Sequence, residues 1–103
     1  MTVIDQVQLK ERLGSGRAVV VDFTADWCQP CRAIAPELDK LEAQYGGVDF
    51  VKVDADANPE LVNELGVMGL PTVVHFGTDG VEVARTTGAA PAQALEFRLR
   101  LSE

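Results

Sequence analysis

The stretch VVVDFTADWCQPC, residues 19–31, joins a strongly apolar segment to the only two cysteines of the chain. Residues 18–25, AVVVDFTA, are apolar at both alternating sets of positions apart from Asp22, which is typical of a β-strand covered on both faces. From Gln29 onward the apolar positions change to helical spacing. The sequence therefore predicts a buried strand that runs directly into a helix, with Cys28 and Cys31 at the junction.

The predicted helix extends over residues 29–45. Its apolar positions are Cys31, Ile34, Ala35, Leu38, Leu41 and Tyr45. Their spacing indicates one buried stripe, and Gly46-Gly47 ends it. Pro36 removes a backbone hydrogen bond inside the helix, so we expect a kink one turn in.

The rest of the chain alternates between strand and helix patterns. Predicted strands cover residues 2–5, 48–55, 72–76 and 81–86, and further predicted helices cover 6–13, 60–65 and about 91–101. Asn58-Pro59 is a helix-start pattern, and residues 77–80, GTDG, form a hairpin signal. The order β-α-β-α-β-α-β-β-α predicts an α/β fold with a central mixed sheet and helices on both faces. With 103 residues, we expect a single domain, 1–103.

Charge and hydropathy exclude several classes of partner. The chain has 9 basic and 16 acidic residues and a net charge of −7, whereas a nucleic-acid-binding surface needs clustered lysine and arginine. No apolar run approaches the roughly 18 residues of a membrane span. The first residues, MTVIDQVQLKERL, lack the basic start and apolar core of a secretory signal. We therefore expect a monomer located in the cytoplasm, with no nucleic-acid or membrane partner.

Four interpretations compete for the C-x-x-C pair. A zinc site needs about four ligands, and only His75, within a strand, adds to the cysteines, so no metal is expected. A structural disulfide is weakly supported, because the stabilisation by a disulfide grows with the length of the loop that it closes, and this loop is very short. Two inert buried thiols are the third interpretation. The fourth, a redox-active dithiol, also explains the position of the pair.

The strand-to-helix junction suits redox chemistry. Cys28 is predicted at the helix N-terminus, exposed to solvent, where free N–H groups and the macrodipole favour a thiolate. Cys31 lies one turn further, on the buried stripe, within reach of a mixed disulfide at Cys28. Pro30 suits the first helical turn because its missing N–H is not needed there. Cys28 is thus the candidate nucleophile and Cys31 the candidate resolving thiol.

These residues carry a resemblance to a known family. VVVDFTADWCQPC, followed by RAIAPELDKL, VKVDADANPELVNELGVMGLPTVVHF and TTGA, resembles the thioredoxin family over nearly the whole chain. The resemblance implies the thioredoxin fold and a protein-disulfide reductase that acts on disulfide-containing proteins. It implies recycling by the flavoenzyme thioredoxin reductase, and no bound cofactor, since the electrons reside on sulfur.

The resemblance also assigns supporting roles. Asp22 interrupts an apolar strand, and burial would raise the pKa of its carboxyl, which suits proton transfer with Cys31. The matching aspartate of the family has that role. Lys52 is either an ordinary solvated lysine or, as in the family, a modulator of that aspartate.

The remaining candidates form a docking surface. The resemblance implies a cis Leu70-Pro71 bond that faces the dithiol, and a shallow apolar groove beside Trp27. The groove is expected to contain Gly69, Leu70, Gly88 and Ala89. Trp27 is expected at its rim, and His75 is interpreted as structural.

Two positions depart from the family pattern. Gln29 stands where glycine is usual between the cysteines, so Gln29 and Pro30 are expected to tune the redox potential. Thr24 stands where an aromatic is usual.

A disulfide oxidase or isomerase is an alternative function. Such relatives usually carry histidine between the cysteines and are exported, whereas this chain has Gln29 and Pro30 there and shows no secretory signal. A non-catalytic binding module on the same scaffold is a further alternative, against which the intact Cys28, Cys31, Asp22 and Leu70-Pro71 argue.

Overall fold

The computed structural model describes all residues, 1–103, as a five-stranded sheet with four helices. The strands are β1 (Thr2–Val3), β2 (Ala18–Thr24), β3 (Val48–Asp54), β4 (Thr72–Phe76) and β5 (Glu82–Thr87). The helices are α1 (Gln6–Leu13), α2 (Gln29–Gln44), α3 (Pro59–Glu64) and α4 (Ala92–Arg98). The predicted element order is confirmed. None of these helices is long and apolar enough to cross a membrane.

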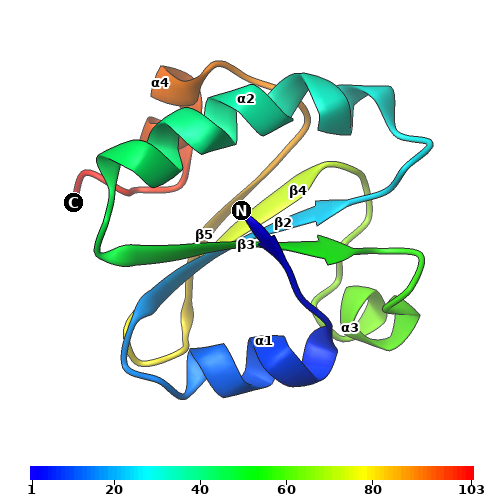
Figure 1. Ribbon diagram of the computed structural model, residues 1–103, viewed down its shortest axis with the longest axis horizontal. Coiled ribbons are helices and arrows are strands. Elements are labelled where there is room, and N and C mark those ends of the chain that lie inside the picture. Colours follow the sequence, from blue (N-terminus) through cyan, green and yellow to red (C-terminus); the bar gives the residue numbers. More distant parts are fainter.

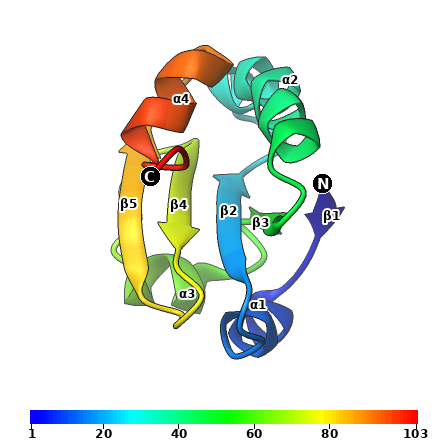
Figure 2. The ribbon, with the colours of Figure 1, turned by 90° about the vertical axis from the view of Figure 1, so that its left-hand side faces the viewer.

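The sheet is mixed, with the strand order β1-β3-β2-β4-β5. Strands β1, β2 and β3 are parallel, and β4 and β5 are each antiparallel to the preceding neighbour in the sheet. Helices α2 and α4 cover one face, and α1 and α3 cover the other (Figure 1). The view turned by 90° again shows α2 and α4 on one side of the strands and α1 and α3 on the other (Figure 2). β2 is the central strand of the sheet, and helices cover it on both faces, as its apolar sequence predicted.

Alternating residues of β2 belong to two different core layers. Val19, Val21 and Phe23 pack with Leu9 of α1 and Leu61 of α3. Each side chain of this size contributes about 1.5–3 kcal/mol when it is buried. This layer holds the α1 and α3 face of the sheet together.

The opposite layer positions the dithiol helix. Val20 of β2 packs with Ile34, Leu38 and Leu41 of α2. Side chains two residues apart on a strand share a face, so Asp22 also faces α2. Cys31 shares a helix face with Ile34, three residues on. Asp22 and Cys31 are thereby placed in the same layer between β2 and α2.

Helices α2 and α3 lie where the sequence predicted them, but the side chain of Asn58 does not form the expected N-cap. α2 continues through Pro36 to Gln44. Asn58 precedes α3 but does not cap it with its side chain. Instead its Oδ1 accepts from the Gln6 amide at 3.1 Å and its Nδ2 donates to the Asp54 carbonyl at 2.9 Å. Asn58 therefore ties the start of α1 to the end of β3.

The last helix is shorter than predicted. α4 ends at Arg98 instead of about residue 101, because Arg100 adopts a positive φ of 59°, a conformation that a right-handed helix cannot contain. At its start, the Ala92 amide donates to Glu37 Oε1 of α2 at 3.0 Å. A side chain of α2 thus replaces the cap that Pro91 cannot supply.

Candidate active site

Cys28 is the N-cap residue of α2, and it forms a disulfide with Cys31. The Cα atoms are 5.3 Å apart. The Cys31 amide donates to Cys28 Sγ at 3.2 Å. One otherwise free N–H of the first turn therefore points at the Cys28 sulfur, where a thiolate would be stabilised by hydrogen bonding and by the helix dipole.

The predicted solvent exposure of Cys28 is wrong for this structure. Cys28 and Cys31 are both only 3% exposed. The disulfide holds Cys28 against the first turn, where both cysteines cluster with Ala25 and contact Leu70. Exposure therefore does not distinguish the two sulfurs, and the helix N-cap position does.

Asp22 is a buried carboxylate without a hydrogen-bond partner. It is 1% exposed, and neither Oδ1 nor Oδ2 accepts a hydrogen bond. Burial raises the pKa of Asp22 from an ordinary 3.8 to about 6, while the charge of Lys52 lowers it. Lys52 is the residue opposite Asp22 in the β2–β3 register. The carboxyl group is therefore poised to gain or lose a proton near neutral pH.

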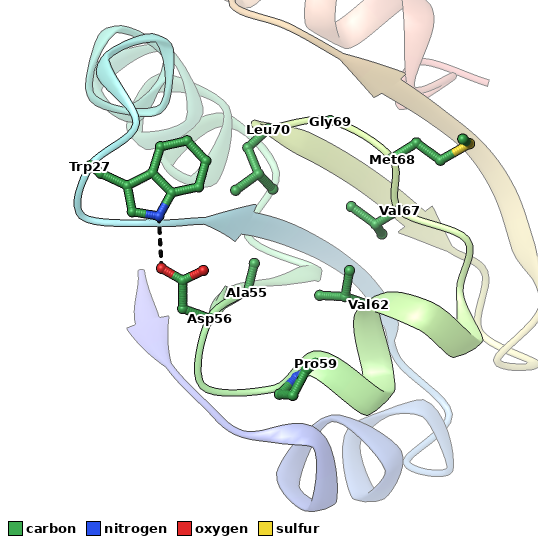
Figure 3. A pocket seen from close by; sticks show the side chains of 9 residues that line it. All are labelled: Trp27, Ala55, Asp56, Pro59, Val62, Val67, Met68, Gly69 and Leu70. Atoms are coloured by element: carbon green, nitrogen blue, oxygen red, sulfur yellow. Dashed lines mark hydrogen bonds between the residues drawn. The ribbon is translucent and has the colours of Figure 1, made fainter.

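Trp27 lies at the surface next to the disulfide, 67% exposed. Its Nε1 donates to Asp56 Oδ2 at 2.7 Å (Figure 3). Asp56 was not among the predicted site residues. One sequence feature could have identified it. Trp27 follows the end of β2 and Asp56 follows the end of β3, and neighbouring parallel strands end at the same edge of a sheet.

A pocket of about 360 Å³ lies beside Trp27. Figure 3 shows the side chains that line it, namely Trp27, Ala55, Asp56, Pro59, Val62, Val67, Met68, Gly69 and Leu70. Gly69 and Leu70 were predicted there. Met68 stands at the rim and is 97% exposed. Asp56 is the only charged residue in this apolar wall.

Gly88 and Ala89 lie outside this pocket. The Gly88 amide donates to the Pro71 carbonyl at 2.8 Å, and the Leu70-Pro71 bond is cis, as the resemblance implied. Ala89 lines a separate hollow with Ala33, Glu37, Ala90 and Pro91. The structure thus places these two residues beyond Pro71, and not in one groove with Trp27.

The other predicted residues have simpler surroundings. Gln29 and Pro30 are the first two residues of α2 and are exposed. The buried His75 places Nδ1 2.7 Å from the Leu99 carbonyl, which links β4 to the end of α4. No group of three histidine, cysteine or acidic side chains is arranged to hold a metal ion.

A mixed sheet that presents a C-x-x-C disulfide at the N-cap of a helix defines a thiol–disulfide oxidoreductase by fold and site. The family model named Thioredoxin matches residues 2–100. The chain therefore belongs to the thioredoxin family, whose members exchange disulfides through such a cysteine pair.

Sequence and structural relatives agree with this assignment. Thioredoxin 1 of a Nostoc species is 39% identical over 94% of this chain and 91% of its own length. Thioredoxin of Mycolicibacterium smegmatis is 39% identical over 92% of this chain and 87% of its own length. Fasciola hepatica thioredoxin superimposes with a TM-score of 0.87 at 37% identity, and Plasmodium falciparum thioredoxin with 0.89 at 27%, each covering 100% of both chains.

Proposed function

We propose that this chain is a protein-disulfide reductase of the cytoplasm that donates electrons to client proteins and is recycled by a thioredoxin reductase. The observation that carries the proposal is the Cys28–Cys31 pair at the N-cap of α2, next to the exposed Trp27. A reducing compartment suits a pair that must return to the dithiol state. The chain acts as a monomer, because the exchange needs only one copy of the site.

The reaction begins with the reduced pair. Cys28 thiolate attacks a client disulfide, a Cys28–client mixed disulfide forms, and one client sulfur leaves as a thiolate. Cys31 then loses its proton and attacks Cys28, which expels the second client sulfur. The client gains two electrons, the chain gains a disulfide, and the client thiolates take up protons.

Asp22 accepts the proton from Cys31. Support comes from its placement in the layer between β2 and α2 and from a carboxyl pKa of about 6. A base with a pKa near the working pH is the efficient choice. Lys52, opposite Asp22 in the sheet, modulates that proton affinity.

The client docks over the apolar surface around the disulfide. Trp27, Gly69 and Leu70 form one side of this surface, and Pro71 with Gly88 and Ala89 continues it beyond the cis bond. This division rests on Trp27, Gly69 and Leu70 lining one hollow and Ala89 lining another, and on the Gly88 amide that donates to the Pro71 carbonyl. Gln29 and Pro30, exposed between the cysteines, tune the reduction potential.

Insulin reduction tests the proposal. The chain with dithiothreitol should precipitate insulin faster than dithiothreitol alone, and the double variant Cys28→Ser/Cys31→Ser should not. Coupled NADPH oxidation with a thioredoxin reductase tests the recycling partner. A wild-type rate equal to that of the reductant alone would indicate a binding scaffold.

A further inference from the structure

Residues 67–70, VMGL, form one wall of the pocket beside Trp27 and belong to no helix or strand. Figure 3 shows these four residues in the connection between α3 and β4. The 67–70 segment leaves α3 through Gly66, whose φ is 66°, a left-handed conformation that glycine adopts without strain. Because no helical or strand pairing holds this wall, its position depends on the contacts at its two ends.

One side chain of β5 holds the start of the 67–70 segment. Arg85 Nη2 donates to the Leu65 carbonyl at 2.8 Å, and Arg85 Nη1 lies 3.5 Å from the Gly66 carbonyl. Both carbonyls lie at the end of α3, where no further amide of the helix remains to pair with them. A guanidinium from a distant strand therefore fixes the point at which the segment begins.

A β-bulge places Arg85 on the side of the sheet that faces α3. Arg85 lies opposite Val74 in the β4–β5 register. Glu82 lies opposite Phe76, because the register shifts and leaves Val83 as an extra residue. Val74 and Phe76 both pack in the core layer on the α1 and α3 face. Glu82 and Arg85 therefore share that face, although residues three apart on a regular strand would not.

Glu82 orients the guanidinium of Arg85. Arg85 Nε and Nη2 donate to the two Glu82 carboxylate oxygens, each at 2.6 Å. Such a bidentate pair fixes the plane of the guanidinium. The Arg85 side chain is 32% exposed, and an ion pair so close to solvent adds little free energy. The pair therefore serves to direct Arg85 at the end of α3 more than to stabilise the fold.

The same strand holds the other end of the 67–70 segment. Thr72 Oγ1 donates to the Gly69 carbonyl at 2.5 Å and lies 3.1 Å from Thr87 Oγ1. Thr72 is buried and lies opposite Thr87 in the β4–β5 register. β5 thus anchors the wall twice, through Arg85 at its start and through Thr87 and Thr72 near its end.

We propose that Arg85, oriented by Glu82, is a positioning residue for client recognition. It lines neither the pocket nor the cluster around the disulfide, and it acts through the Leu65 and Gly66 carbonyls. By holding the 67–70 segment in place, it keeps the pocket beside Trp27 in the shape that receives apolar side chains of a client. The inference rests on the proposed reductase function and adds to it a residue of the edge strand.

Arg85→Met removes the guanidinium and keeps an unbranched side chain. Protein reduced beforehand and freed of reductant is mixed with insulin, a protein client, and separately with 2-hydroxyethyl disulfide, which is too small to need the pocket. The second-order rate with insulin should fall about fivefold, the loss expected for about one hydrogen bond. The rate with 2-hydroxyethyl disulfide should stay at the wild-type value, because the dithiol is untouched.

Two further variants keep this test decisive. Arg98→Met, at an exposed position of α4, removes the same charge and should leave both rates unchanged. Glu82→Gln keeps the size of the side chain but removes the charge that orients Arg85, so it should slow insulin reduction selectively and covers the case in which Arg85→Met fails to fold. Circular dichroism and thermal unfolding check each fold. Unchanged insulin rates, or equal slowing with both disulfides, would overturn the proposal.

A measurement without any client separates this inference from the proposed function. Backbone ¹⁵N relaxation of the oxidised protein gives order parameters for the amides of residues 67–70. These should fall from about 0.85 toward 0.6 in Arg85→Met, the change from rigid to flexible backbone, and remain unchanged in Arg98→Met. Order parameters that stay at the wild-type values in Arg85→Met would overturn the positioning role, whereas wild-type protein that fails to reduce insulin would contradict the reductase function.

Discussion

Asp22 of β2 lies directly opposite Lys52 of β3 in the parallel register, yet the two side chains form no ion pair and both Asp22 oxygens lack a hydrogen bond. An unpartnered buried carboxylate costs free energy in its charged form. The folded protein therefore holds a proton on Asp22 to a higher pH than the unfolded chain does.

Asp22→Asn should stabilise the oxidised protein above neutral pH. The carboxyl pKa is 3.8 ordinarily and about 6 when folded, so the folded state binds more protons between these values and wild-type stability falls as pH rises through them. Removing the charge should add about 2–3 kcal/mol above that window. The gain should shrink toward zero near about pH 4. Urea unfolding at both ends of the window measures it, and a gain independent of pH would contradict the assignment.

The same Asp22→Asn substitution should slow turnover while the fold is kept. The resolving thiol loses its proton acceptor, so we expect the rate to drop by about 10²-fold or more, the lower range for general-base catalysis. Client reduction is followed for both proteins across about pH 6–9, where such thiols titrate. Identical pH profiles would remove Asp22 from the mechanism.

Cys28→Ser and Cys31→Ser should fail for different reasons. Since both sulfurs are equally buried, the prediction depends on the thiolate-stabilising N-cap position of Cys28. Cys31→Ser should accumulate client proteins as mixed disulfides, because attack proceeds without resolution. Cys28→Ser should trap none. Non-reducing gels with and without dithiothreitol show the adducts, and the opposite pattern would reverse the two roles.

Gln29→Gly should change the reduction potential. The substitution removes a side chain and frees the backbone at the first residue of α2, beside the thiolate. A tenfold change in equilibrium constant corresponds to about 30 mV, so a redox titration against glutathione is sensitive enough. Potentials that agree within a few millivolts would exclude tuning by this residue.

Asp56→Ala should weaken client binding through Trp27. The substitution removes the acceptor of the indole N–H, which is 2.7 Å away, and frees the exposed ring to reorient. A typical hydrogen bond contributes a net of about 1 kcal/mol, and we expect its loss at this exposed position to give about a fivefold rise in KM with little change in kcat. Glu11→Ala, on the exposed side of α1, is the matched control. An unchanged KM would show that the indole orientation does not matter.

The order of strands and helices and the position of the dithiol followed from the sequence alone. Apolar periodicity indicates how many faces of a segment are covered. The continuous apolar run of β2 predicted a strand covered on both faces, and the helical spacing of α2 predicted one buried stripe. The junction between them therefore placed Cys28 at a helix start and Cys31 on the buried stripe. The resemblance added the cis Leu70-Pro71 bond, which local pattern does not encode.

Tertiary structure alone decided which distant residues meet. The strand order β1-β3-β2-β4-β5 brings Asp56 to Trp27 and separates Ala89 from the Trp27 pocket. It also decided that Cys28 is buried, and that Thr24, Cys31 and Lys52 line one hollow between β2, β3 and the start of α2. These facts depend on register, packing and the space left between layers, which arise from contacts distant in the chain and leave no periodic trace in its sequence.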